Sequence, residues 1–393
     1  MHKPANTFGP SIFTITSAGT VKPIYTLAPS ALTATMVQAT GGNLYTPALF
    51  HPSGNSAYYS LSLLGKGVQQ YPLPAQWGSL WHTVAAPRGD IYDILGIAPN
   101  GALTSAFVQV SETGKITFLH QFSAADGFPT GNNMVYALDG NFYGIGTQQQ
   151  NGVSPGFIFR FTPSGTYSQI LTFPEFPGHS AFPLMAASDG NLYGTFTAGG
   201  ANNTGEIYQV TLAGQFQTVA SFPAKGMTDP WTLMQAADGN IYGTTNYNQI
   251  FRYDLTTHQL TMVYQLDPGG SQGKCACILI EGMDGKLYGV APYGGSYPGY
   301  GTVFTLNIGL PKPKPAVTGL YPPSGPVGQQ VILWGNYLLG ATSVSFNGTP
   351  AITFSATTVQ SVSATVPAGA TSGPVTVTTA NGSFTTTTSF TVQ

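Results

Sequence analysis

The sequence predicts an all-β protein in which a β-propeller is followed by a small β-sandwich. A short phrase built around a tyrosine returns six times in 393 residues, at intervals of 46 to 51 residues. A period near 50, with glycine and aromatic residues at fixed places, is typical of a radial array of small sheets. No helical period interrupts the array, and the last 80 or so residues read as short strands separated by turn residues. The six tyrosines are Tyr45, Tyr92, Tyr143, Tyr193, Tyr242 and Tyr288.

Each unit resolves into four short strands, most clearly between residues 182 and 222. The Asp189-Gly190 pair predicts a tight hairpin in which both turn residues tolerate positive φ. Four strands joined by turns in about 50 residues describe one propeller blade. The expected strands are PLMAAS (183–188), NLYGTFT (191–197), IYQVT (207–211) and QFQTVASF (215–222).

The number of blades follows from the incomplete units at the two ends of the array. The last unit has a third strand, VFTL (303–306), and no fourth before the chain enters LPKPKP. VKPIYTL (21–27) resembles a fourth strand, so we expect it to complete the last of six blades and remove an exposed edge. IFTIT (12–16) resembles a surplus third strand, and a partial seventh blade is the alternative.

The repeated aspartates and tyrosines are interpreted as architecture rather than as a ring of metal ligands or acids. Each aspartate is the first residue of an Asp-Gly turn, where its side chain can accept hydrogen bonds from nearby backbone groups. We expect the tyrosines to pack between neighbouring sheets. The aspartates are Asp139, Asp189, Asp238 and Asp284.

These phrases resemble the glycine-rich tandem repeat of secreted bacterial proteins known as the Gloeo-Verruco, or GloVer, repeat. The family pattern is DGxLYGTT, a glycine-rich loop, GTVF, and a strand that ends in LxxF. DGNIYGTT (238–245), GTVF (301–304) and ILTF (170–173) match it directly, and the resemblance covers roughly residues 10–308. The family carries no settled activity, so the resemblance implies a fold and not a reaction.

The C-terminal region predicts a separate β-sandwich. Residues 1–309 are assigned to the propeller, 310–316 to a stiff linker that alternates Pro and Lys, and 317–393 to the sandwich. PAVTGLYPPSGPVGQQVILWGNYL (315–338) resembles the opening of the IPT/TIG immunoglobulin-like domain, and VPAGATSGPVTVTTANG (366–382) continues the likeness. We expect Trp334 to lie in the core of this domain.

Charge excludes several functions. Residues 315–393 contain no Lys, Arg, His, Asp or Glu, so the DNA-binding role of some relatives of this domain cannot apply, because phosphate contact needs cations. The net charge is −2 and charged residues form only 7% of the chain. We therefore expect neither a nucleic-acid partner nor attraction to an anionic membrane, and no apolar stretch is long enough to span a membrane.

The candidate binding residues lie in loops that differ between units. In a propeller, the loops from fourth to first strand and from second to third strand open on one face. Aromatic rings and amides on such a face suit the apolar and hydroxylated faces of sugars, so we expect a glycan or a cell-surface polymer as the partner. The candidates are Trp77, Trp81, His82, Asp126, Glu175, His179, Asp229, Trp231 and Tyr297.

Two alternatives to a binding protein remain at this stage. One is a structural subunit of an extracellular layer or filament, since low charge favours self-association. The other is a carbohydrate-active enzyme, a glycosidase or lyase using Glu175, Asp229, Asp126 and His179. No GxSxG, HExxH, EF-hand or phosphate-binding glycine motif is present, so neither a cofactor nor a metal is expected.

The expected location is extracellular or on the cell surface, on the basis of composition. Asn, Gln, Ser and Thr take the polar positions that Lys and Glu would normally fill, and there are 50 glycines. The N-terminal residues MHKPANTFGPSIF lack the apolar segment of a signal peptide. The exporting signal is therefore not visible in this chain.

Overall fold

The computed structural model is entirely β in the part of the chain that it describes. The described residues are 11–16, 19–27, 31–33, 36–50, 56–74, 77–79, 83–97, 104–148, 156–173, 183–267, 270–272, 278–295 and 301–393. No helix within these ranges has the length and apolarity to cross a membrane.

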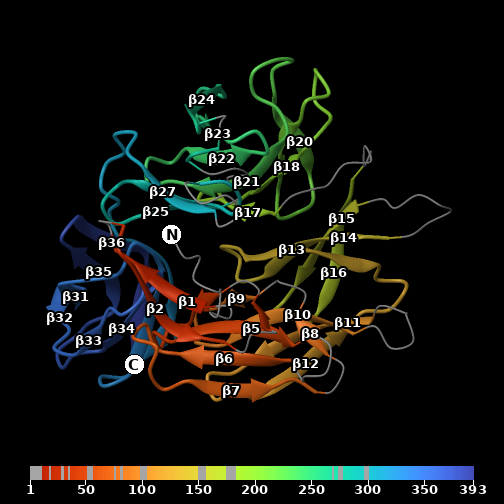
Figure 1. Ribbon diagram of the computed structural model, residues 1–393. Coiled ribbons are helices and arrows are strands. Elements are labelled where there is room, and N and C mark those ends of the chain that lie inside the picture. Colours follow the sequence, from red (N-terminus) through yellow and green to blue (C-terminus); the bar gives the residue numbers. More distant parts are fainter. Residues whose placement is uncertain are drawn as a thin grey trace, which may run out of the picture.

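Six antiparallel sheets follow one another along the chain, and we number them blade 1 to blade 6 (Figure 1). Blades 3, 4 and 5 are four-stranded with strands in chain order, and blades 1 and 2 have a first strand split into two pieces. Blade 1 contains β3 (Ala31–Thr33), β4 (Val37–Gln38), β5 (Leu44–Phe50), β6 (Ala57–Leu61) and β7 (Gln69–Pro72). Blade 2 contains β8 (Gly78–Ser79), β9 (Val84–Ala85), β10 (Ile91–Ile97), β11 (Thr104–Val110) and β12 (Ile116–Gln121).

The remaining blades keep the same up-and-down order. Blade 3 contains β13 (Phe128–Tyr136), β14 (Phe142–Thr147), β15 (Gly156–Phe161) and β16 (Tyr167–Thr172). Blade 4 contains β17 (Met185–Ala186), β18 (Leu192–Phe196), β19 (Glu206–Val210) and β20 (Phe216–Ser221). Blade 5 contains β21 (Pro230–Gln235), β22 (Ile241–Thr245), β23 (Gln249–Tyr253) and β24 (Leu260–Gln265). Blade 6 contains β25 (Ile278–Glu281), β26 (Leu287–Ala291) and β27 (Thr302–Leu306).

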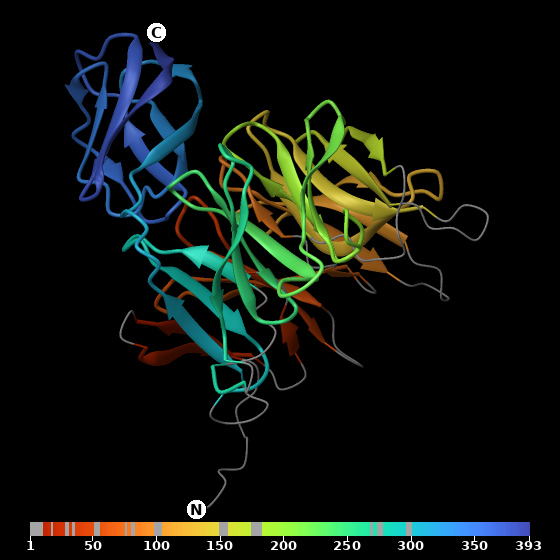
Figure 2. The same ribbon diagram turned by 90° about the horizontal axis from the view of Figure 1, so that it is seen from above.

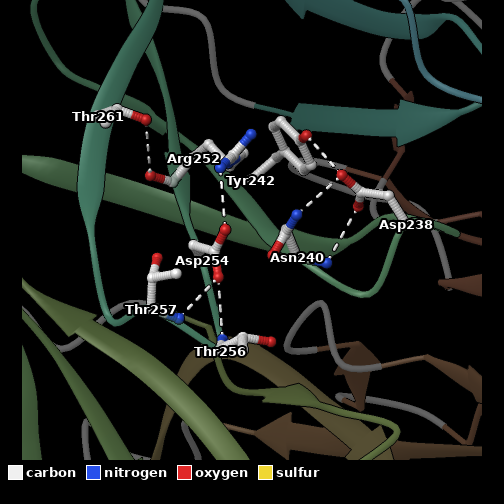
Figure 3. Close-up of polar contacts among 8 residues, drawn as sticks. All are labelled: Asp238, Asn240, Tyr242, Arg252, Asp254, Thr256, Thr257 and Thr261. Carbon is white, nitrogen blue, oxygen red and sulfur yellow. Dashed lines mark hydrogen bonds and ion pairs between the residues drawn. The ribbon is translucent and has the colours of Figure 1, made fainter.

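The Asp-Gly turns carry the structural role expected for the repeated aspartate and tyrosine (Figure 3). In blade 5, Asp238 Oδ2 accepts hydrogen bonds from the Tyr242 hydroxyl and the Asn240 side chain, both at 2.9 Å. The Tyr242 side chain is 2% exposed and packs against Leu287 of blade 6. The aspartate therefore satisfies a tyrosine that is buried between sheets, and the same bond recurs at Asp139–Tyr143, Asp189–Tyr193 and Asp284–Tyr288.

The turn itself differs from the expected two-residue hairpin. Only the glycine has positive φ, +86° at Gly239, and Asp238 is not left-handed. The Gly239 amide donates to Ala236 O, and the Ala236 amide donates to Asn240 O. These bonds describe a three-residue turn that ends in a left-handed glycine, in which the aspartate can keep a common conformation while its side chain caps the turn.

The glycine that follows the repeated tyrosine is required by a close approach of the third strand. Gly243 pairs with Phe251, whose ring lies over it, and a Cβ at Gly243 would collide with that ring and approach Thr232 O to 2.6 Å. In blade 2 the equivalent pair is Asp93 and Val108. The smaller valine leaves room for the Asp93 side chain, whereas blade 1 has Thr46 at the glycine position opposite Tyr59.

The N-terminal strands correct the expected closure of the ring. β2 (Val21–Thr26) pairs with β1 (Ser11–Ile15) in a two-stranded sheet, and not with β27. Ile12 and Ile24 of this hairpin pack against Leu44 and Leu61 of blade 1. The hairpin forms locally, through the turn in which the Thr16 amide donates to Thr20 O at 3.0 Å. The prediction that residues 21–27 complete the last blade is wrong for this structure.

The C-terminal part forms two sheets around one apolar cluster, and we call it the C-terminal sandwich (residues 316–392). One sheet has the order β28-β30-β34-β33 and the other β29-β36-β35-β31-β32. Buried residues of both sheets, among them Val331, Leu333, Val375 and Phe390, form the cluster. The strands are β28 (Ala316–Tyr321), β29 (Ser324–Gly325), β30 (Gln330–Asn336), β31 (Ser343–Phe346), β32 (Thr349–Pro350), β33 (Phe354–Ser355), β34 (Ser361–Thr365), β35 (Gly373–Thr379) and β36 (Gly382–Val392).

Trp334 joins this sandwich to the propeller rather than filling its core. The indole is 8% exposed and belongs to an apolar cluster with Ala39 and Ala85 of blades 1 and 2. Its ring meets Tyr136 of blade 3 edge-on, at a centroid distance of 6.4 Å. Figure 2 shows the sandwich on one side of the blades. The prediction that Trp334 lies in the core of the C-terminal domain is therefore wrong, because the residue is buried against the blades.

Candidate functional site

The loops predicted to share a face do meet in the structure. The Asn246 amide, between β22 and β23, donates to Asp229 O, between β20 and β21, at 2.9 Å. The Asp229 amide in turn donates to Thr204 O of the loop between β18 and β19, also at 2.9 Å. These contacts join the two kinds of loop, and we call this end of the blades the loop face. The opposite end, which carries the Asp-Gly turns and the C-terminal sandwich, is the turn face.

Asp126 is held in a local network between β12 and β13. Its Oδ2 accepts from the Ser123 amide at 2.7 Å and the Ser123 hydroxyl at 2.8 Å, and lies 3.4 Å from Nε2 of His120. Burial alone would raise the pKa of Asp126, but the Ser123 donors and the His120 imidazole lower it below the ordinary value. The His120 ring stacks on Tyr167 at 5.1 Å, and the Tyr167 hydroxyl donates to Asp126 O at 2.8 Å. The carboxylate is thus a fixed, ionised acceptor at neutral pH.

Asp229 is positioned by its backbone as much as by its side chain. It adopts φ = +58°, a left-handed conformation that Asp tolerates better than most residues. Its Oδ2 accepts from Nδ2 of Asn246 at 2.9 Å. The result is a paired amide and carboxylate at the edge of blade 5, both able to bond to further hydroxyl groups.

Two exposed tyrosines stand on the loop face of blades 5 and 6. Tyr247, at the tip of the β22–β23 turn, is 62% exposed, and Tyr293, directly after β26, is 61% exposed. Nε2 of Gln265 donates to Tyr247 O at 3.1 Å and holds the turn in place. The candidates selected from the sequence include Tyr297 of the β26–β27 loop but neither Tyr247 nor Tyr293. The available signal was the short Asn246–Asn248 connection, which places any central residue at a hairpin tip.

Asp267 begins the loop after β24 and forms a second fixed acceptor beside these tyrosines. Its Oδ2 accepts from the Ser271 hydroxyl at 2.5 Å, and its amide donates to Oε1 of Gln272 at 2.7 Å. The Gln272 side chain also bonds to the Tyr264 hydroxyl, with Nε2 at 3.2 Å. Amides, hydroxyls and one carboxylate therefore lie together at the junction of blades 5 and 6.

The two described tryptophans among the candidates, Trp77 and Trp231, are both half-buried. Trp77 is half-buried, with its ring 5.1 Å from that of Phe118 and tilted by 59°. Trp231 lies on β21, where its carbonyl accepts the Thr195 hydroxyl at 2.8 Å. Five further candidates fall outside the described residues: Trp81, His82, Glu175, His179 and Tyr297.

Two buried carboxylates, Asp93 and Glu206, are not among the candidates selected from the sequence. Asp93, fully buried, accepts from the Tyr58 hydroxyl at 2.5 Å and the Thr83 hydroxyl at 3.1 Å. Burial raises the pKa of Glu206, and the Thr218 hydroxyl and the Gly200 amide offset part of this effect. The signal for Asp93 was its place in the glycine position of the repeat. Both groups are enclosed by protein and lie apart from the exposed tyrosines.

The structure brings the candidate acids together only in part. Asp126 bonds within its own loop and Asp229 bonds to Asn246 of the β22–β23 turn, and in the described ranges no ion pair or hydrogen bond connects the two carboxylates. Nor do three His, Cys, Asp or Glu side chains gather as metal ligands anywhere in the part of the chain that the structure describes.

Comparison with known proteins identifies the repeat and the fold. The Gloeobacter/Verrucomicrobia repeat matches residues 96–249 and 184–389. No curated protein matches the sequence. An oligogalacturonate lyase in complex with manganese has 14% identity and a TM-score of 0.55, covering 77% of this chain and 83% of that one.

Two further solved structures give the same picture. A Lactobacillus plantarum protein has 14% identity and a TM-score of 0.51, covering 78% of this chain and 97% of that one. An oligogalacturonate lyase from Vibrio parahaemolyticus has 12% identity and a TM-score of 0.50, covering 92% and 99%. At such identities the likeness shows the fold alone, which is propeller-like. By its repeats, the chain belongs to the Gloeobacter/Verrucomicrobia repeat family.

Proposed function

We propose that this protein binds a neutral, polyhydroxylated polymer, a carbohydrate, on the loop face of blades 5 and 6. The observation that carries the proposal is the pair of exposed tyrosines, Tyr247 and Tyr293, on corresponding loops of adjacent blades. A sugar ring offers an apolar C–H face that packs on an aromatic ring, and its hydroxyls need directed partners. Asp229, Asn246 and Gln272 supply such partners nearby.

The hydrogen bonds that hold the candidate carboxylates favour carbohydrate binding over carbohydrate hydrolysis. A glycosidase needs two carboxylates that flank one scissile bond. Asp126 is instead held by Ser123 of its own loop, and Asp229 by Asn246 of the β22–β23 turn. Two of the similar solved structures are of oligogalacturonate lyases. The low identity gives no residue that would transfer that activity to this chain.

The C-terminal sandwich is proposed to be an IPT/TIG-type Ig-like domain that covers the turn face. Its two sheets around one cluster and its opening sequence at 315–338 support this assignment. Because the C-terminal sandwich contacts the turn face, the loop face is the side that remains for a ligand.

We also propose that β1–β2 is the outer half of a seventh blade. Gly65, in the turn between β6 and β7, lies close to Ile24 of β2, just as Gly214, in the turn between β19 and β20, lies close to Ile170 in the fourth strand of the preceding blade. An extracellular or cell-surface location fits the uncharged surface of the sandwich.

The test is binding of the full chain to an array of neutral and acidic polysaccharides. We expect saturable binding to a neutral glycan that falls by roughly tenfold in Tyr247→Ala or Tyr293→Ala, the loss of about one stacking contact. Leu64→Ala is the matched control, because Leu64 is 74% exposed in the turn between β6 and β7, at the turn-face end. No binding to any glycan, or equal loss in all three variants, would overturn the proposal.

A further inference from the structure

Blade 6 ends in an edge where the other blades have a fourth strand. Its order is β25-β26-β27, and among the residues that the structure describes no strand pairs with the outer side of β27. In blades 1 to 5 the corresponding strand is followed by β7, β12, β16, β20 and β24. Blades 1 to 5 therefore show the kind of strand that would pair with the outer side of β27, a place that no described strand occupies.

The first residue of the fourth strand covers an aromatic ring of the third strand. In blade 4, the Phe216 ring lies 5.7 Å from Tyr208 and 5.9 Å from Phe173 of blade 3. In blade 3, Tyr167 takes the same place, 6.4 Å from Phe159. The covered rings of Phe159 and Tyr208 are fully buried.

The residue after the fourth strand closes the blade. Phe222 is fully buried, and its amide donates to Gly205 O, just before the third strand, at 2.9 Å. The Leu266 amide does the same to Asn248 O in blade 5, at 2.9 Å. Gly301 holds the corresponding place in blade 6, directly before β27. In blades 2 to 5 the pattern is an aromatic or aliphatic residue six positions before Phe or Leu, and in blade 1 Val68 lies five positions before Leu73.

In blade 6 this place is a groove of about 210 Å³. Leu266, Phe304 and Leu306 form its apolar wall, and Phe304 is only half-buried, unlike its counterparts. One end is polar, where the Thr302 hydroxyl donates to Gln272 O at 2.7 Å.

The edge strand lacks two of the usual protections against pairing, which are charge and proline. TVFTL (302–306) has no charged residue and no proline, and an edge strand of this kind pairs readily with another chain. β2 has the fourth-strand pattern but is paired with β1. No described segment pairs with the outer side of β27, although β2 carries the sequence pattern that would suit the groove.

We propose that the groove along β27 binds an extended polypeptide segment with the fourth-strand pattern, by strand addition. Backbone bonds to β27 would supply affinity, and two apolar side chains six positions apart would supply selectivity. The site lies at the outer edge of blade 6, next to the proposed glycan site, with which it shares Gln272. Its ligand class is a peptide, and its recognition elements are Phe304, Leu306 and Leu266.

The experiment titrates the full chain with a blocked peptide that copies residues 216–222, FQTVASF. Isothermal titration should show one saturable site, and the matched peptide AQTVASA should bind roughly tenfold more weakly or worse, because both apolar anchors are removed. Hydrogen exchange should show slower exchange in β27 when FQTVASF is bound. Absence of saturable binding, equal binding of both peptides, or protection confined to other strands would overturn the proposal.

Discussion

The Tyr337 hydroxyl of the C-terminal sandwich donates a hydrogen bond to Oε2 of Glu281 in blade 6. The same oxygen accepts the Ala237 amide of blade 5 at 2.8 Å. Burial raises the pKa of Glu281, and these two donors offset part of the increase. One carboxylate thus ties two blades and the sandwich together on the turn face.

Removing the Tyr337 hydroxyl tests this tie. We expect Tyr337→Phe to lower the free energy of unfolding by about 1.5 kcal/mol, since hydrogen bonds to charged groups contribute about 1.5–3 kcal/mol. Urea unfolding measures the change. Tyr293→Phe is the control, because that ring is exposed on the loop face. Equal effects of the two variants would show that the bond contributes nothing specific.

Truncating Trp334 tests the attachment of the sandwich. Loss of a buried tryptophan costs about 3–5 kcal/mol in a core, and here we expect the loss to appear as separation of two folded units. Small-angle X-ray scattering should report a larger radius of gyration for Trp334→Ala, with unchanged far-ultraviolet circular dichroism. Ile352→Ala, at a residue that is 93% exposed, is the control. A Trp334→Ala chain as compact as the wild type would contradict this role.

The pairing of glycine and ring across strands two and three predicts a compensating double substitution. Gly243→Ala should destabilise blade 5 by about 1–3 kcal/mol through overpacking against Phe251. Adding Phe251→Val makes room, as Val108 does for Asp93. A double-mutant cycle should give a favourable coupling of about 1 kcal/mol or more. Additive effects would mean that the two residues do not constrain each other.

The turn aspartates predict an acid-sensitive fold. Burial alone would raise the pKa of Asp189, but the Asn191 amide, the Tyr193 hydroxyl and other donors lower it below the ordinary value. The stability that such a depressed pKa supplies is full above the ordinary Asp pKa of about 3.9 and is lost as pH falls through the lower, folded value. Urea midpoints of Asp189→Asn should fall less than those of the wild type between pH 4 and pH 2. Parallel pH profiles would contradict this assignment.

The sequence predicted what repeats and missed what depends on contacts between units. The spacing of Tyr143, Tyr193 and Tyr242 located the blades, and Asp-Gly pairs located their turns, because these are local signals. The closure by residues 21–27 failed because a hairpin with β1 closes a short loop, whereas pairing with β27 spans the whole ring. Trp334 was misplaced for a related reason. Alternation puts it on the opposite face from Val331 and Leu333, and only the docked propeller buries that face.

The candidate site was predictable as a face but not as a set of side chains. Topology alone indicated that the loops holding Asp126 and Asp229 open on the same side. It could not show that each carboxylate already accepts a hydrogen bond, Asp126 from Ser123 and Asp229 from Asn246. Tyr247 was missed because its turn is short, and a search for long, variable loops passes over it.

The most direct test of the central claim is a hydrogen-exchange footprint of the full chain with the polysaccharide that binds on the array. The account predicts slower exchange in residues 223–229, 246–248, 266–267 and 270–272, on the loop face of blades 5 and 6. Slower exchange confined to the Asp-Gly turns or to the C-terminal sandwich would contradict it.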